Sequence, residues 1–177
     1  MKLFQLILIL LILFTSYPTN ASRDNNSYDG NIFPIYAGNG AIVPPQTTIE
    51  ESLKNGRISV LFFYLDDSSD SKAMAPVISG LDLIWRNNID LIALTTDELQ
   101  SNGSDSTSNQ PNYYWNGLIP QTIILDSTGD VKFDNNGIVN IDDLNKIIGE
   151  LKGIDIKDSK FSVESFNEYN SIISEKK

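Results

Sequence analysis

The fold is decided by Leu61-Phe62-Phe63-Tyr64-Leu65 and the stretch that follows it, Asp66-Asp67-Ser68-Ser69-Asp70-Ser71-Lys72-Ala73-Met74-Ala75-Pro76. The first stretch is almost continuously apolar, which is typical of a strand covered on both faces of a sheet. The second begins as a polar loop and then repeats apolar residues at three- and four-residue spacing to about Arg86, which predicts an amphipathic helix. Further along, Gly117-Leu118-Ile119-Pro120-Gln121-Thr122 leads into another predicted strand. The core thus begins as strand, polar loop and helix, and later places a proline before a strand.

The other elements follow from periodicity and capping residues. Thr48 and Glu51 fit a capping box that opens a short helix, and Asn140 is placed to cap a helix over 141–151. Four strands are predicted, at 58–65, 90–95, 122–126 and 131–133, and the last two form a hairpin. We expect the first two strands to be parallel, because a helix connects them.

This order of elements resembles that of thioredoxin. Ser71-Lys72-Ala73-Met74-Ala75-Pro76 is similar to the thioredoxin Cys-Lys-x-x-Ala-Pro segment, and Ile119-Pro120-Gln121-Thr122 is similar to the segment that carries the cis-proline. The resemblance implies a thioredoxin-like α/β fold, a three-layer sandwich with a central mixed sheet. It also implies that the Ile119–Pro120 bond is cis.

The chemistry of thioredoxin is missing from this chain. Ser68 and Ser71 occupy the positions of the two thioredoxin cysteines, and the chain contains neither cysteine nor histidine. A serine hydroxyl cannot carry out thiolate exchange, and Ser-His or Cys-His pairs and ordinary zinc sites are impossible without these residues. The acidic loop of Asp66, Asp67 and Asp70 could hold a hard cation or could be a solvated loop that caps the next helix. We expect no enzyme activity, no metal and no cofactor.

The chain divides into four parts. Residues 1–21 combine Lys2, an apolar run and small residues at Thr19 and Ala21, a pattern that predicts a signal peptide or a membrane anchor. Residues 22–46 form an N-terminal extension with a predicted hairpin or tight turn around Gly38-Asn39-Gly40. Residues 47–153 are the thioredoxin-like domain, and residues 154–177 are a polar C-terminal tail.

A closer resemblance extends over most of the chain after the first part. Tyr28-Asp29-Gly30-Asn31-Ile32-Phe33, Tyr36-Ala37-Gly38-Asn39-Gly40, Phe63-Tyr64-Leu65-Asp66-Asp67-Ser68-Ser69-Asp70 and Ser165-Phe166-Asn167-Glu168 are similar to the cyanobacterial thylakoid membrane photosystem I accumulation factor. The resemblance implies a non-catalytic factor, in the thylakoid lumen or periplasm and associated with the membrane, that supports photosystem I assembly. Its expected partners are photosystem I subunits or assembly proteins. The alternative is an exported thioredoxin-family oxidoreductase relic that has lost its cysteines.

Charge narrows the choice of partner. The net charge of −10 argues against non-specific binding to nucleic acid. We expect instead that an extended peptide docks by strand addition, where the free N–H groups of the first helical turn meet the proline segment. Three consecutive aromatic residues before the proline either enlarge this surface or pack over the edge of the sheet. The candidate residues are Asp67, Ser68, Ser71, Tyr113, Tyr114, Trp115, Ile119 and Pro120.

Overall fold

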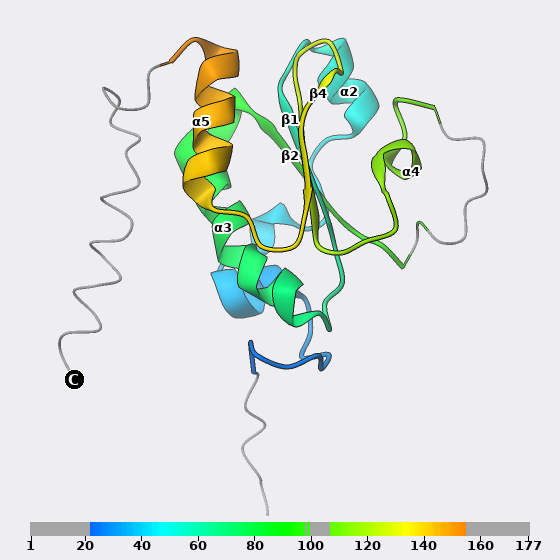
Figure 1. Ribbon diagram of the computed structural model, residues 1–177, viewed down its shortest axis with the longest axis vertical. Coiled ribbons are helices and arrows are strands. Elements are labelled where there is room, and N and C mark those ends of the chain that lie inside the picture. The colour runs from blue at the N-terminus through cyan, green and yellow to red at the C-terminus, as the bar shows by residue number, and fades with distance from the viewer. Residues whose placement is uncertain (1–21, 98, 100–106, 155–177) are drawn as a thin grey trace, which may run out of the picture.

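The computed structural model describes residues 22–97, 99 and 107–154 and arranges them around one four-stranded sheet (Figure 1). The strands are β1 (Ser59–Tyr64), β2 (Asp90–Thr95), β3 (Gln121–Leu125) and β4 (Val131–Asn136). The α-helices are α2 (Ile49–Lys54), α3 (Ser69–Trp85), α4 (Pro111–Tyr114) and α5 (Ile141–Lys152). Three short turns of other helical types complete the order, namely η1 (Phe33–Ala37), η2 (Gly40–Ile42) and η3 (Arg86–Asn88).

The sheet is mixed, with β1 inside it. The strand order is β2-β1-β3-β4, where β1 and β2 are parallel and the β1–β3 and β3–β4 pairs are antiparallel. α3 makes the connection between the parallel strands, as the sequence predicts. All six residues of β1 are buried, because both faces of this strand are covered. This is the thioredoxin-like α/β architecture that the sequence predicts.

The helices cover both faces of the sheet and make three layers. Figure 1 shows α3 and α5 on one side of the strands and α2 and α4 on the other. Each side has its own apolar cluster. Phe62, Trp85 and Leu144 belong to the cluster under α3 and α5, whereas Leu61 and Phe63 belong to the cluster on the opposite side. Alternate residues of β1 therefore point to opposite faces of the sheet and belong to two separate apolar cores.

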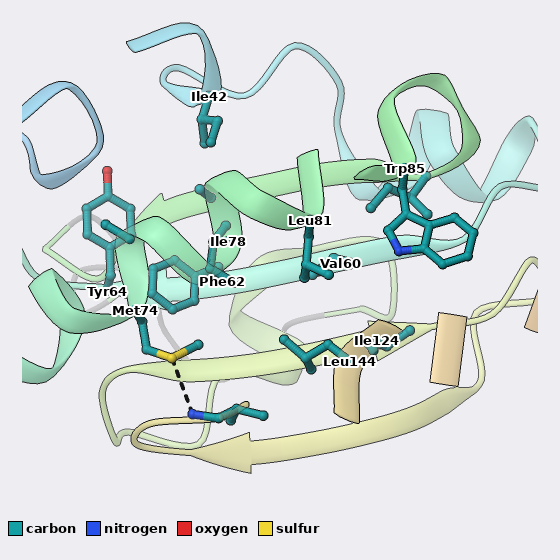
Figure 2. Close-up of a cluster of buried hydrophobic side chains, with 14 of the residues drawn as sticks. Ile42, Val60, Phe62, Tyr64, Met74, Ile78, Leu81, Trp85, Ile124 and Leu144 are labelled. Carbon is teal, nitrogen blue, oxygen red and sulfur yellow. Dashed lines mark hydrogen bonds between the residues drawn. The ribbon is translucent and has the colours of Figure 1, made fainter. Parts of the chain in front are cut away.

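The larger core, on the α3 side, joins distant parts of the chain (Figure 2). The rings of Phe62 and Tyr64 are stacked, with their centroids 5.6 Å apart. The backbone N–H of Val139 donates to the sulfur of Met74 over 3.3 Å, the dashed contact in Figure 2. The buried indole N–H of Trp85 donates to the side-chain oxygen of Asn145 over 2.8 Å and so links α3 to α5.

The predicted helix starts are confirmed, with one shift. The Thr48–Glu51 capping box forms at α2, and the Asn140 side chain caps α5 by accepting from the N–H of Asp142. α3 starts at Ser69 rather than at Ser71, because Ser68 is the N-cap and its hydroxyl accepts from the N–H of Ser71.

Of the two alternatives predicted around Gly38-Asn39-Gly40, the tight turn is confirmed and the hairpin is wrong. The segments on either side of this turn form η1, which packs against α3, and η2, which contacts β2, and they do not pair as strands. Gly38, with φ of 63°, ends η1 in the left-handed conformation. The side-chain amide of Asn39 donates to Ser79 and Asp82 of α3, each over 3.2 Å. The Gly-Asn-Gly signal marks a turn correctly, but tertiary contacts decide what its flanks become.

The two ends of the chain are described only in part. The predicted signal peptide or anchor, residues 1–21, and residues 155–177 of the predicted tail lie outside the described residues. The backbone N–H of Ile154 still donates to the carbonyl of Gly149 over 2.9 Å, and its side chain packs on the core. Within the described ranges, none of the helices is both long enough and apolar enough to cross a bilayer.

Candidate functional site

The hydroxyls at the two thioredoxin-cysteine positions serve the local structure. The Ser68 hydroxyl accepts from the N–H of Ser71 over 3.3 Å and caps α3. The side chain of Ser71 is fully buried, and its oxygen accepts from the backbone N–H of Leu65 over 3.3 Å. Asp67 lies exposed in the preceding turn. The serines thus close the corner between β1 and α3, and neither has a base beside it because the chain has no histidine.

The proline segment lies at the same end of the sheet. The Ile119–Pro120 bond is cis, as predicted. Gln121 pairs with Phe63, so Pro120 lies alongside the end of β1 from which the chain turns into α3. The carbonyl of Pro120 accepts from the N–H of Gly137 over 2.8 Å, whereas neither backbone group of Ile119 has a hydrogen-bonding partner among the described residues. The backbone groups of Ile119 are therefore available to an incoming extended peptide at this end of the sheet.

Two exposed apolar side chains flank this segment, and sequence reasoning missed both of them as site residues. Leu118 is 60% exposed and Ile138 is 64% exposed. Each follows an Asn-Gly pair, Asn116-Gly117 and Asn136-Gly137, and the two asparagine amides exchange hydrogen bonds of 2.9 and 3.1 Å. An apolar residue directly after an Asn-Gly pair, in two matching places, was the available signal. We call Leu118, Ile119, Pro120 and Ile138 the proline rim.

Gln121 fastens the aromatic segment to the sheet. Its buried amide nitrogen donates to the carbonyl of Tyr114 over 3.1 Å and to the carboxylate of Asp134 over 2.8 Å. Its amide oxygen accepts from the backbone N–H of Asn116 over 3.0 Å. One side chain therefore sets the position of the loop that leads into the proline rim.

The three aromatic residues lie on the sheet face opposite α3. Tyr114 is buried, and its hydroxyl donates to the carbonyl of Ser108 over 2.7 Å. Trp115 is partly buried in the same cluster, and only Tyr113, at 57%, is mostly exposed. Burial raises the pKa of Tyr114. The structure therefore brings Ser68, Ser71 and the proline rim to one end of the sheet. The aromatic segment mainly packs over the sheet face opposite α3.

Residues 22–31, which we call the strap, cover the start of α3. The side-chain oxygen of Asn26 accepts from the N–H of Ser69 over 2.9 Å. The expectation of free N–H groups in this first turn is therefore wrong for Ser69, which the strap caps, and for Ser71, which Ser68 caps. Sequence reasoning missed this because a polar segment rich in Asn, Asp and Ser is typical of a linker.

The end of the strap is held by the carboxyl end of β1. The amide of Asn31 donates to the hydroxyl of Tyr64 over 2.9 Å, and the N–H of Ile32 donates to Asp66 over 2.9 Å. Burial raises the pKa of Tyr64 to about 12. Burial also raises the pKa of Asp66, against the opposing effect of the Ile32 hydrogen bond.

The strongest anchor of the strap is Lys72, whose side chain is fully buried. Its ammonium donates to the backbone carbonyls of Ser22, Asn25 and Ser27 over 3.2, 3.1 and 2.6 Å. It also forms an ion pair with Asp29 at 2.8 Å. Burial alone would lower the pKa of Lys72, but the hydrogen bond and the charge of Asp29 outweigh it and the pKa is raised. The same hydrogen bond to Lys72 lowers the pKa of Asp29.

The acidic loop does not gather into a cation site. Asp66 accepts from Ile32, while Asp67 and Asp70 lie exposed. Across residues 22–97, 99 and 107–154, no three acidic, cysteine or histidine side chains converge as metal ligands would.

Comparison with known proteins gives one clear relative. The chain is 33% identical over 155 residues to the thylakoid membrane protein slr1796 of Synechocystis, and the match covers 85% of this chain and 76% of that protein. No model of a known protein family matches the chain. Among solved structures, an exposed lipoprotein thioredoxin of Streptococcus pneumoniae aligns with a TM-score of 0.45 at 13% identity, covering 59% of this chain and 96% of that one.

Proposed function

Because the chain belongs to the family of the Synechocystis thylakoid membrane protein slr1796, we propose that it is a non-catalytic, membrane-associated factor of the thylakoid lumen or periplasm. In this proposal it supports photosystem I accumulation by binding a polypeptide of the photosystem or of its assembly machinery. Association with the membrane is supported by the relative, which is a thylakoid membrane protein. The role in photosystem I accumulation is suggested by the sequence motifs that resemble the photosystem I accumulation factor.

The proline rim is the observation that carries the binding proposal. Exposed Leu118 and Ile138 flank a backbone segment in which Ile119 is unpaired among the described residues. An extended peptide that docks beside Ile119 would gain hydrogen bonds from the backbone of Ile119 and apolar contacts from the side chains of Leu118 and Ile138. Gln121 and the paired asparagines fix the two loops, so little ordering is required on binding.

The chemistry of the site supports binding rather than catalysis. Thiol–disulfide exchange needs a thiolate, and the chain has no cysteine. The hydroxyls of Ser68 and Ser71 are engaged in the β1–α3 corner. A relic of an oxidoreductase would retain this same corner, but the chain has no thiol to carry out the exchange reaction.

The test uses a cyanobacterial strain that lacks this protein and is complemented by defined variants. Leu118→Asp and Ile138→Asp each place a charge at the proline rim without touching the core. We expect each to lower capture of photosystem I subunits from solubilised thylakoids about tenfold, which corresponds to ~1.4 kcal/mol at one interface anchor. Photosystem I content, measured per cell, should fall with capture.

Val131→Asp is the matched control. Val131 is also apolar and is 49% exposed, but it lies at the far end of β4, because it pairs with Leu125 whereas Asn136 pairs with Gln121. This variant should capture photosystem I subunits as the wild type does. Normal photosystem I content with both rim variants, each folded, would exclude the proline rim as the working surface.

A further inference from the structure

Apart from Asn31, whose amide donates to Tyr64, the strap acts as hydrogen-bond acceptor in its contacts with the rest of the protein. The donors are the ammonium of Lys72 and the backbone N–H of Ser69 from α3, and the hydroxyl of Tyr36 from η1. The strap supplies acceptors, namely the carboxylate of Asp29 and the amide oxygen of Asn26, together with three backbone carbonyls that face the ammonium. Asp29 receives both the Lys72 ammonium at 2.8 Å and the Tyr36 hydroxyl at 2.6 Å. The domain surface beneath the strap is therefore built for a carboxylate and for the carbonyls of an extended chain.

The strap is held by polar contacts. Its one aromatic side chain, Tyr28, is 73% exposed, and the buried apolar residues begin only at Ile32, beyond its end. A segment that carries the same polar groups could replace these hydrogen bonds one for one, so that little net free energy is lost. Gly30, with φ of 110°, lies near the end of the strap, where any side chain would be strained.

We propose that the strap is an intramolecular ligand in a binding site centred on Lys72, and that an acidic extended segment of the partner polypeptide displaces it. This inference rests on the proposed function, since it names the chemistry of the partner that the protein binds. A lysine ammonium is a compact charge with three donors, and in a site of this kind it requires an acidic residue. When the strap leaves, the start of α3 opens beside the end of the sheet that carries the proline rim.

The first experiment asks whether the strap can be released. Asp29→Lys in the full-length chain places a like charge beside Lys72 and removes its ion pair. We expect acylation of Lys72 by an amine reagent, followed by mass spectrometry, to be at least about tenfold faster than in the wild type. Lys146 and Lys152, exposed on α5, are internal controls and should react at unchanged rates. Circular dichroism checks that the variant is folded.

The second experiment asks whether the opened site takes an acidic segment. The probe is a fluorescent peptide with the sequence of residues 22–31, SRDNNSYDGN. It should bind the Asp29→Lys protein at least about tenfold more tightly than the wild type, whose own strap competes at high effective concentration. The same peptide with asparagine at the position of Asp29 should lose most of this affinity. Lys72→Met, made in the Asp29→Lys background, should abolish binding, and the asparagine peptide tests the same contact if that variant does not fold.

Either of two results would overturn the inference. One is an unchanged rate of Lys72 acylation in the folded Asp29→Lys protein, because the strap would then not be displaceable. The other is a reactive Lys72 with no binding of the peptide, or equal binding of its acidic and asparagine forms. Both experiments use purified protein without photosystem I. A negative result in these experiments can therefore be told apart from a negative result with the proline-rim variants. The latter would exclude the proposed function even if the peptide binds.

Discussion

At the scale of the residue, Ser71 stands at a position that carries a redox cysteine in thioredoxin, and its side chain has a structural role here. Its buried hydroxyl accepts from the N–H of Leu65 and so joins the end of β1 to the first turn of α3. A thiol at this position would be enclosed and would lack a second thiol to resolve a mixed disulfide.

We therefore expect that Ser71→Cys has no insulin-reductase activity and that iodoacetamide labels it much more slowly in the native protein than in urea. Ser68→Cys is the matched control, because Ser68 is only partly buried and its thiol should react faster in the native state. Insulin reduction by Ser71→Cys, in a preparation free of thioredoxin, would contradict this reading of the site.

Residues whose role is local could be predicted from the sequence, and residues whose role depends on distant partners could not. Thr48 with Glu51, and Asn140, cap the helices that their immediate neighbours form. The burial of Lys72 had no local signal, because its acceptors lie 43 to 50 residues earlier in the chain. Lysine is almost never fully buried unless it is paired, and a short-range pattern does not reveal such a pair.

At the scale of the element, α3 and α5 are in tight contact at a glycine of α3. A β-carbon at Gly80 would lie 2.7 Å from the Cδ1 atom of Ile141, so only a residue without a side chain fits without movement. The apolar spacing of the two helices predicts that both face the core, but it does not give the place where they touch. This is a property of packing that the periodicity of one helix does not contain.

We expect Gly80→Val to lower the free energy of unfolding by about 1–3 kcal/mol, because the added carbons overpack the α3–α5 contact. Urea titration followed by tryptophan fluorescence measures the change. Ile141→Ala removes the obstructing atoms, so the double variant should be more stable than the sum of the two single effects predicts. Strict additivity of the two changes would show that Ile141 is not the obstacle.

At the scale of the whole molecule, the stability of the fold depends on carboxylates that are ionised in specific places. The carboxylate of Asp126 accepts from the N–H and hydroxyl of Thr128 and the N–H of Asp130, and it pairs with Lys132 at 2.8 Å. The hydrogen bond from Lys132, followed by that from Thr128, lowers the pKa of Asp126. The pKa of Asp29 is lowered as well, first by Lys72. Asp66 has the opposite effect on the pH dependence of stability, because burial raises its pKa.

The sign of the pH dependence follows from these shifts. A carboxyl whose pKa is lower in the folded state stabilises the fold above its unfolded pKa of about 4, and this contribution is lost as the pH falls toward the folded value. We expect the urea midpoint to fall as the pH drops from 6 to 3. Asp126→Asn should be less stable than the wild type at pH 6, and the difference should shrink by pH 3. A difference that stays constant with pH would exclude this carboxylate as a source of the acid sensitivity.

The contacts of Lys72 also determine when the strap can bind during synthesis of the chain. Ser22 precedes Lys72 by 50 residues and Asp29 precedes it by 43, so the ribosome releases the strap long before the lysine that holds it exists. Until α3 has emerged and packed against β1, the polar segment has nothing to bind. In the absence of a bound partner, an accessible strap therefore marks a nascent or incompletely folded chain. A quality-control protease or chaperone that recognises residues 22–31 would distinguish finished molecules from unfinished ones.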